Sequence, residues 1–262
     1  MTDASGPEAA LAAHGGIRTE LADWFPLVQA LGVPVPRTTL IPTNGMELFS
    51  MFDNESNETI EAAKAAILAA ASEVGFPAFL RTGLTSAKHE WKHTCRLDSP
   101  EAVPRALYSL TEAQEMYWLP PVETFVVREM LAVTPLFHAF EDMPIVNERR
   151  YFVTDGKVVD RQNYWPLSAI DGHLDRLSEH PVVDDWRERL IAAAQESPEE
   201  VAELTALSEQ VASVLPGSWS VDWLQTTSGW VFIDAAWAET SYVMPAQDRE
   251  ALGSSLAPVF AS

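Results

Sequence analysis

The sequence is poor in cysteine and in basic residues. Its single cysteine, Cys95, cannot form an internal disulfide and lacks the paired spacing of a zinc site, so we predict a small buried hydrophobic side chain there. Only 17 Lys and Arg residues accompany 38 Asp and Glu residues, which gives a net charge of -21. A field of this sign repels phosphate backbones and anionic lipids, so binding to nucleic acid or to a membrane surface is not expected.

The sequence also lacks a targeting segment and a long apolar run. The first 16 residues show no basic region followed by a hydrophobic stretch, so we expect neither a signal peptide nor a membrane anchor, and a cytoplasmic location. A composition of 47% hydrophobic and 21% charged residues is typical of a globular chain and excludes a disordered one. A length of 262 residues allows one large domain or two lobes, and no internal repeat or low-complexity linker separates them.

Hydrophobic periodicity and turn residues predict alternating helices and strands in the first half of the chain. The helix over 57–75 has the clearest limits, because Asn57 can cap its start and Gly75 its end. A polar loop is expected over 83–90. The other predicted helices cover 17–31 and 99–115, and the predicted strands cover 38–41, 76–82, 91–97 and 122–130.

Two hairpins are the main prediction for the second half. Asp155-Gly156 is a strong turn signal between apolar strands at 151–153 and 158–159. A second hairpin pairs 218–225 with 230–235, and its tryptophans are expected to pack in the core. Helices are predicted over 183–194, over 197–215 and from Pro245 onward.

Charged residues interrupt or end several of these apolar runs, at the points where strands pass into loops. Several cations that face several carboxylates suit a nucleoside triphosphate with magnesium, because the cations bind phosphates and the carboxylates bind the metal. Neighbouring residues on a strand face opposite ways, so only one of Arg128 and Glu129 can face the cleft. The cations are Arg81, Lys88, Lys92, Arg128 and Arg150, and the carboxylates are Glu129, Glu148, Asp222 and Asp234.

In their order along the chain, these motifs resemble the ATP-grasp superfamily of carboxylate-activating ligases, from about Trp24 to Tyr242. The family usually has lysine where Arg81 stands, and an arginine followed by Lys88 and Lys92 resembles the clade named for one arginine and two lysines, a set of predicted peptide ligases. The matching stretches are 31–39, 76–81, 126–131, 148–156, and 221–222 with 232–234.

The resemblance implies an α+β fold in which two lobes hold the nucleotide between antiparallel sheets. We predict a disordered N-terminus over 1–16. A short N-terminal region over 17–75 stands in place of the separate substrate lobe that the family commonly carries. The ATP-grasp domain then covers 76–262, with a small lobe over about 76–130 and a large lobe over about 131–262.

The resemblance also implies ATP and Mg²⁺ as cofactors and a role for each charged residue. Arg81, Lys88 and Lys92 would hold the α- and β-phosphates, and Glu129 and Leu131 would meet adenine at the hinge. Arg150 would reach the γ-phosphate or the acylphosphate, so Arg150 and Arg81 are the candidate catalytic residues. Asp222 and Asp234 would bind the metal.

Some positions depart from the family or have a plainer interpretation. Ala236 stands where the family usually has an asparagine ligand, so either Glu239 replaces that ligand or magnesium is held more weakly. Lys88 could equally be a solvated loop lysine. His89 and His93 would suggest a metal pair only on a helix, and the predicted loop and strand argue against one.

The function that follows from the resemblance is an ADP-forming carboxylate–amine ligase. Its substrates would be small molecules or peptides that supply a carboxylate and an amine, and no covalent nucleophile is needed. The stretches 126–131 and 148–155 also resemble the eukaryotic cell-division-cycle family that chaperones a translation initiation factor. The alternative is therefore an ATP-binding assembly or regulatory factor, a nucleotide-gated clamp on a protein partner. A third hypothesis is phosphotransfer to a hydroxyl group.

Overall fold

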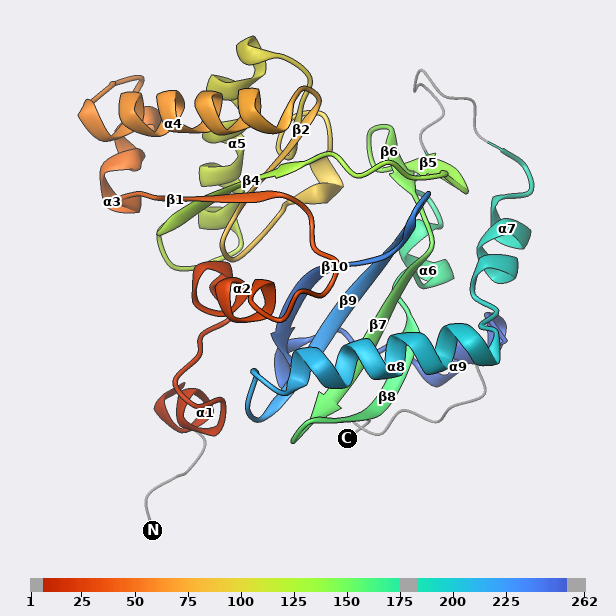
Figure 1. Cartoon of the computed structure of the whole chain (residues 1–262). Helices are drawn as coiled ribbons and strands as arrows, with labels where there is room; N and C mark the ends of the chain where they lie inside the picture. The colour runs from red at the N-terminus through yellow and green to blue at the C-terminus, as the bar shows by residue number, and fades with distance from the viewer. Residues whose placement is uncertain (1–6, 175–182, 254–262) are drawn as a thin grey trace.

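The computed structural model describes residues 7–174 and 183–253 and places two four-stranded antiparallel sheets beside each other (Figure 1). The strand orders are β1-β4-β2-β3 in the first sheet and β10-β9-β7-β8 in the second. A small two-stranded sheet, β5-β6, lies beside them. The predicted α+β class with antiparallel sheets is confirmed.

The first sheet is covered on one face by two helices, α4 (Glu58–Val74) and α5 (Val103–Met116). The side chain of Asn57 caps α4 by accepting a hydrogen bond from the Ile60 amide at 2.9 Å, as its position predicts. The strands are β1 (Thr38–Pro42), β2 (Ala78–Thr82), β3 (Arg96–Leu97) and β4 (Thr124–Glu129).

The second sheet carries α8 (Pro198–Ala212) on one face, where Trp219 and Trp223 are fully buried. The predicted core position of the tryptophans in this hairpin is confirmed for these two and for Trp230. Helix α2 (Leu21–Gln29) packs at the β10 edge, with the ring of Trp24 5.6 Å from that of Phe232. The strands are β7 (Glu148–Thr154), β8 (Lys157–Asn163), β9 (Ser218–Thr226) and β10 (Gly229–Trp237).

The turn of the first predicted hairpin is confirmed. Asp155 and Gly156 have φ angles of 48° and 80°, so both adopt the left-handed conformation that a tight hairpin between twisted strands requires. Along β7, residues two apart point to the same side, which places Glu148 and Arg150 on one face of the sheet.

A third cluster surrounds the small sheet, β5 (Phe137–Ala139) and β6 (Met143–Ile145). It includes residues of α6 (Leu167–Ile170) and α7 (Trp186–Ala193) and the two residues Met244 and Leu252 that flank α9 (Ala246–Ala251), and it buries Cys95 as predicted. The remaining short elements are α1 (Pro7–Ala13), α3 (Gly45–Leu48), and the 3₁₀ turns η1 (Phe49–Asp53), η2 (Lys88–Glu90), η3 (Pro100–Ala102) and η4 (Ala238–Thr240). Along the described residues, no helix is long and apolar enough to cross a membrane, and the cytoplasmic location stays a prediction.

The predicted strand over 91–97 is wrong for most of its length. Only Arg96 and Leu97 pair with β2, while 91–95 form turns. The Thr94 hydroxyl lies 2.9 Å from the carbonyl oxygens of Ala87 and Glu90, and this side-chain bonding favours a turn over a strand ladder.

The N-terminal part also differs from expectation. Of the stretch 1–16 predicted to be disordered, residues 1–6 lie outside the described part of the chain and Pro7–Ala13 form helix α1. His14 after this helix is buried with its ring stacked on Trp237. Residues 17–75 supply β1 and α4 to the first sheet and its covering layer, so they form no separate layer of their own. The division of the chain at residue 76 stays a prediction.

Candidate functional site

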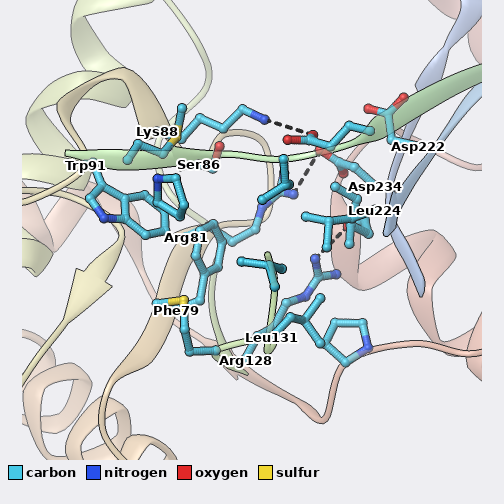
Figure 2. Close-up of a pocket in the computed structure, with 18 of the residues that line it drawn as sticks. Phe79, Arg81, Ser86, Lys88, Trp91, Arg128, Leu131, Asp222, Leu224 and Asp234 are labelled. Atoms are coloured by element: carbon cyan, nitrogen blue, oxygen red, sulfur yellow. Dashed lines mark hydrogen bonds and ion pairs between the residues drawn. The ribbon is translucent and has the colours of Figure 1, made fainter. Parts of the chain in front are cut away.

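A pocket lies between the facing surfaces of the two large sheets (Figure 2). Strand alternation explains its walls. Phe79, Arg81 and Arg128 lie on the face of the first sheet that is opposite to α4 and α5. Asp222 and Leu224 lie on the face of the second sheet that is opposite to α8.

One side of the pocket is apolar. Phe79 lies there with Trp91, their ring centroids 6.0 Å apart, on the side away from Asp222 and Asp234 (Figure 2). The chain segment after β4 adds Met130 and Leu131. A flat apolar ring fits such walls, because burying its surface gains hydrophobic free energy.

The other side is charged, and Arg81 and Asp234 form its first ion pair. Nη1 of Arg81 lies 2.9 Å from Oδ2 of Asp234, and Arg81 is 5% exposed. Asp234 on β10 is directly opposite Asp222 on β9, which places two carboxylates beside each other on one face of the sheet. Both predicted metal ligands therefore line one wall of the pocket.

Arg150 and Asp222 form the second ion pair. Nε and Nη2 of Arg150 each donate to one oxygen of Asp222 at 2.8 Å. Burial alone would lower the pKa of Arg150, but the Asp222 carboxylate raises it above its ordinary value, so the guanidinium stays charged. Arg150 lines a second, neighbouring pocket, and Tyr164 lines both.

Lys88 forms the third ion pair, with Glu148. Its Nζ lies 3.4 Å from Oε2 of Glu148 and 4.1 Å from the centre of the Tyr164 ring. Burial would lower the pKa of Lys88, but Glu148 raises it above its usual range. Burial raises the pKa of Glu148, which Lys88 and the indole N–H of Trp165, 2.9 Å from Oε1, partly oppose. The solvated alternative for Lys88 does not hold, because its side chain is only 19% exposed and pairs with Glu148 in the pocket lining.

Glu129 and Leu131 line the pocket at the predicted hinge, but the Glu129 carboxylate is already occupied. Its two oxygens accept from the backbone N–H and Nε of Arg37 at 2.8 and 2.9 Å. These bonds to Arg37 lower the pKa of Glu129. Of the two neighbours 128 and 129, it is Arg128 whose side chain is on the cleft face of β4.

Two predicted site residues are not brought to this pocket. Nζ of Lys92 lies 3.3 Å from Asp142, in the turn between β5 and β6, and Lys92 does not line the pocket. The carboxylate of Glu239 lies 3.5 Å from Nε2 of His14, and this side chain is 59% exposed. Neither arrangement matches the predicted role, because each charge is paired with another residue away from Asp222 and Asp234.

Arg128 was predicted only as one of several candidate cations with no specific role, although the structure makes it a prominent pocket residue. Its Nη1 donates to the Ile233 carbonyl at 2.6 Å, but Nε and Nη2 are buried with no hydrogen-bond partner in the described parts of the chain. Burial and the nearby Arg81 lower the pKa of Arg128 to about 9. The available sequence signal was the spacing of two between Arg128 and Val126, which places both side chains on one face of the strand. Glu148 was also predicted with no specific role, and Tyr164 was not predicted.

The chemistry of the donor set suits a divalent cation only in part. Across residues 7–174 and 183–253, no group of three or more His, Cys, Asp or Glu side chains could hold a metal ion. Asp222 and Asp234 are two adjacent carboxylates, and Mg²⁺ in nucleotide enzymes is commonly held by one or two carboxylates together with phosphates. These two residues fit an ion that arrives with a nucleotide.

Residues 70–256 match the model of an ATP-grasp domain family, the third family of the clade named for one arginine and two lysines. The chain belongs to this family. The predicted resemblance to that clade is thereby confirmed. None of the curated proteins matches the sequence.

Solved structures are similar to this chain over most of its length. C-terminally truncated Cdc123 from Schizosaccharomyces pombe superposes with a TM-score of 0.54 at 12% identity, covering 88% of this chain and 89% of that one. The VanG D-Ala:D-Ser ligase from Enterococcus faecalis gives 0.50 at 12% identity, covering 84% and 52%. A RimK-domain ATP-grasp protein from Sphaerobacter thermophilus gives 0.46 at 14% identity, covering 94% and 66%. The chain therefore spans 52% to 66% of the length of the two latter proteins.

Proposed function

We propose that this protein is an ATP-dependent carboxylate–amine ligase that forms ADP. One observation carries the proposal: a single pocket joins an apolar side to buried cations and two adjacent carboxylates. The apolar side suits a nucleotide base, and the charged side suits its phosphates. Membership of the ATP-grasp family supports the nucleotide as ATP.

The reaction proposed for this site has two steps. A carboxylate oxygen of the first substrate attacks the γ-phosphorus of ATP, an oxygen–phosphorus bond forms, and ADP leaves. The nitrogen of an amine then attacks the acyl carbon, a carbon–nitrogen bond forms, phosphate leaves and the amine loses a proton. Each step moves negative charge between oxygens, so preorganised cations are the main contribution that the protein can make.

The side chains of the pocket supply these cations. Arg81 and Lys88 would bind the phosphates, for which they must exchange part of their contact with Asp234 and Glu148. The free N–H groups of Arg128 can donate to an acceptor of the nucleotide. Arg150 would stabilise the oxygens that develop charge during phosphoryl transfer.

Asp222 and Asp234 would hold Mg²⁺. When bound, this ion would neutralise phosphate charge. Both carboxylates already neutralise an arginine, so they would pair less strongly with these arginines once the ion shares them.

The direct test is ADP release from MgATP with a panel of amino acids and dipeptides as joint carboxylate and amine donors. We expect ADP release only when both a carboxylate and an amine are present. Arg81→Met should abolish this release, and Arg105→Met should leave it intact. Arg105 is the control because it lies on α5, outside the pocket lining. Nucleotide binding with no release under any donor pair would contradict the ligase.

A nucleotide-gated clamp on a protein partner is the second candidate. It is favoured by the pairing of Asp222 and Asp234 with arginines, which occupies both carboxylates. Such a set suits tight binding with slow turnover. MgATP binding together with slow, amine-independent hydrolysis would support this candidate.

A further inference from the structure

A second pocket, here called the side pocket, opens beside the nucleotide pocket. Arg150 lies in its lining, and Tyr164 lines both pockets. The two cavities therefore meet at the Arg150–Asp222 ion pair, on whose other side the proposed phosphate site lies. A molecule in the side pocket would be next to the phosphate end of the nucleotide.

The charge of the side pocket is unusual for this chain. The protein has a net charge of -21, yet no carboxylate belongs to the described lining of this pocket. Its charged member is Arg150, and His89 is the other titratable base. Burial and the neighbouring Lys88 lower the pKa of His89, so at neutral pH the ring is an uncharged wall. The described lining therefore offers one cationic side chain, shared with Asp222, and no carboxylate that would repel an anion.

Arg150 still has donors to offer. A guanidinium carries five N–H groups, and the contacts with Asp222 and with the Tyr242 carbonyl, at 3.3 Å, use three of them. Two N–H groups remain, and the side chain is 13% exposed. A carboxylate in the side pocket can accept from them without displacing Asp222.

The other walls are aromatic. Tyr164, Trp165 and Tyr242 line the pocket together with His89. The ring of His89 is held in place by stacking on Phe140, with centroids 4.5 Å apart and planes at 12°. Fixed flat rings favour a flat or apolar group between them.

An acidic residue stands near the edge. Oδ2 of Asp248 accepts a hydrogen bond at 2.8 Å from Ser168, which lines the pocket. Burial together with Asp248 raises the pKa of Tyr242, so this carboxylate acts on the same edge. It would repel a second carboxylate on a ligand and tolerate an amine.

We infer that the side pocket binds the carboxylate substrate, and that this substrate is a monocarboxylate with an aromatic or flat apolar group. That the bound molecule is a substrate rests on the proposed function, whereas the existence of the binding site is inferred from the lining residues alone. The carboxylate would lie on Arg150, from which one of its oxygens can reach the terminal phosphate.

Benzoate is the probe for the binding test, with benzamide, acetate and phthalate as comparison ligands. Saturation-transfer NMR on the full chain is expected to show that benzoate binds with at least ten times the affinity of the uncharged benzamide and of acetate, which has no ring. The dicarboxylate phthalate is expected to bind at least fivefold more weakly than benzoate. Two variants locate the site: Tyr242→Ala removes a wall, and Ser168→Trp fills the pocket. Each should weaken benzoate at least fivefold, whereas Tyr117→Ala, an exposed tyrosine after α5, should not.

Benzoate that binds no better than benzamide, or equally to wild type and both side-pocket variants, would overturn the inference. Calorimetry with MgATP on the same samples separates this result from the proposed function. MgATP binding without benzoate binding refutes the side pocket alone. Benzoate binding that Ser168→Trp removes, in a protein that does not bind MgATP, supports the site and refutes the ligase.

Discussion

Arg150 on β7 and Asp222 on β9 are direct cross-strand neighbours, and two hydrogen bonds of 2.8 Å join their side chains. This pair forms the border between the nucleotide pocket and the side pocket. Asp222 is buried and Arg150 is only 13% exposed, which makes each partner costly to remove alone.

Asp222→Ala is expected to lower the free energy of unfolding by about 3 kcal/mol, because it leaves the buried guanidinium without its counter-charge. The double variant Asp222→Ala with Arg150→Met should lose less, since no unpaired charge remains. Urea unfolding monitored by circular dichroism measures both. The exposed pair Lys157–Glu209 is the control, and Lys157→Ala should cost less than about 1 kcal/mol. Equal losses in the single and double variants would contradict a coupled pair.

The two loop lysines are predicted to behave differently. Lys88→Met should weaken MgATP binding by about ten- to a hundredfold, the value of one charge-assisted hydrogen bond, because Lys88 lines the pocket. Lys92→Met should change binding less than threefold, because Lys92 pairs with Asp142. Isothermal titration of both variants is the measurement. A larger loss of affinity for Lys92→Met than for Lys88→Met would show that Lys92 contacts the phosphates after all.

Arg128→Met should stabilise the nucleotide-free protein and weaken nucleotide binding. Removing a buried cation that has no carboxylate partner should raise the free energy of unfolding by about 1 to 3 kcal/mol. MgATP should then raise the melting temperature less than in wild type. Thermal unfolding with and without MgATP measures both effects, and a full nucleotide-induced shift in the variant would make Arg128 a structural residue only.

Glu20 is predicted to make stability depend on pH. It is 3% exposed, and it is so close to Gly83 that a Cβ there would overlap its carboxyl group. Burial, with help from Glu123, raises the pKa of Glu20 to about 7. Because the pKa of Glu20 is higher in the folded protein than its unfolded value of 4.5, the protonated side chain stabilises the fold. This stabilisation is complete below pH 4.5 and is lost as the pH rises through about 7.

Glu20→Gln keeps the shape of the side chain and removes this ionisation. At pH 8 the free energy of unfolding of the variant should therefore be higher than that of wild type by up to about 3 kcal/mol, and this difference should shrink toward pH 5. Urea unfolding at several pH values is the measurement. Parallel curves for the two proteins would show that Glu20 does not ionise in this range.

Local signals sufficed for much of the fold. Asn57 and Gly75 fixed the limits of α4, and Asp155-Gly156 fixed the β7–β8 turn, because caps and tight turns depend on a few neighbouring residues. The prediction of a strand over 91–97 failed because the Thr94 hydroxyl bonds the carbonyl oxygens of Ala87 and Glu90 and so favours a turn. Helix α1 was missed because His14 contacts partners more than 200 residues away.

The candidate site was partly predictable for the same reason. Arg81, Asp222 and Asp234 interrupt apolar strands; strand pairing places Asp222 opposite Asp234, and the packing of the two sheets brings Arg81 to them. The pairing of Lys92 with Asp142 and of Glu239 with His14 depends on how loops fold, which spacing does not specify. The N–H groups of Arg128 that lack a partner could not be predicted, because they depend on how the side chains around β4 pack.

The central claim is that the pocket between the two sheets binds a nucleoside triphosphate with its metal. Calorimetric titration of MgATP into wild type, Asp234→Asn and Glu239→Gln tests it most directly. We predict saturable binding to wild type, the same affinity within twofold for Glu239→Gln, and at least a tenfold loss for Asp234→Asn, which removes a pocket carboxylate. No binding to wild type, or equal affinity for Asp234→Asn, would contradict the account.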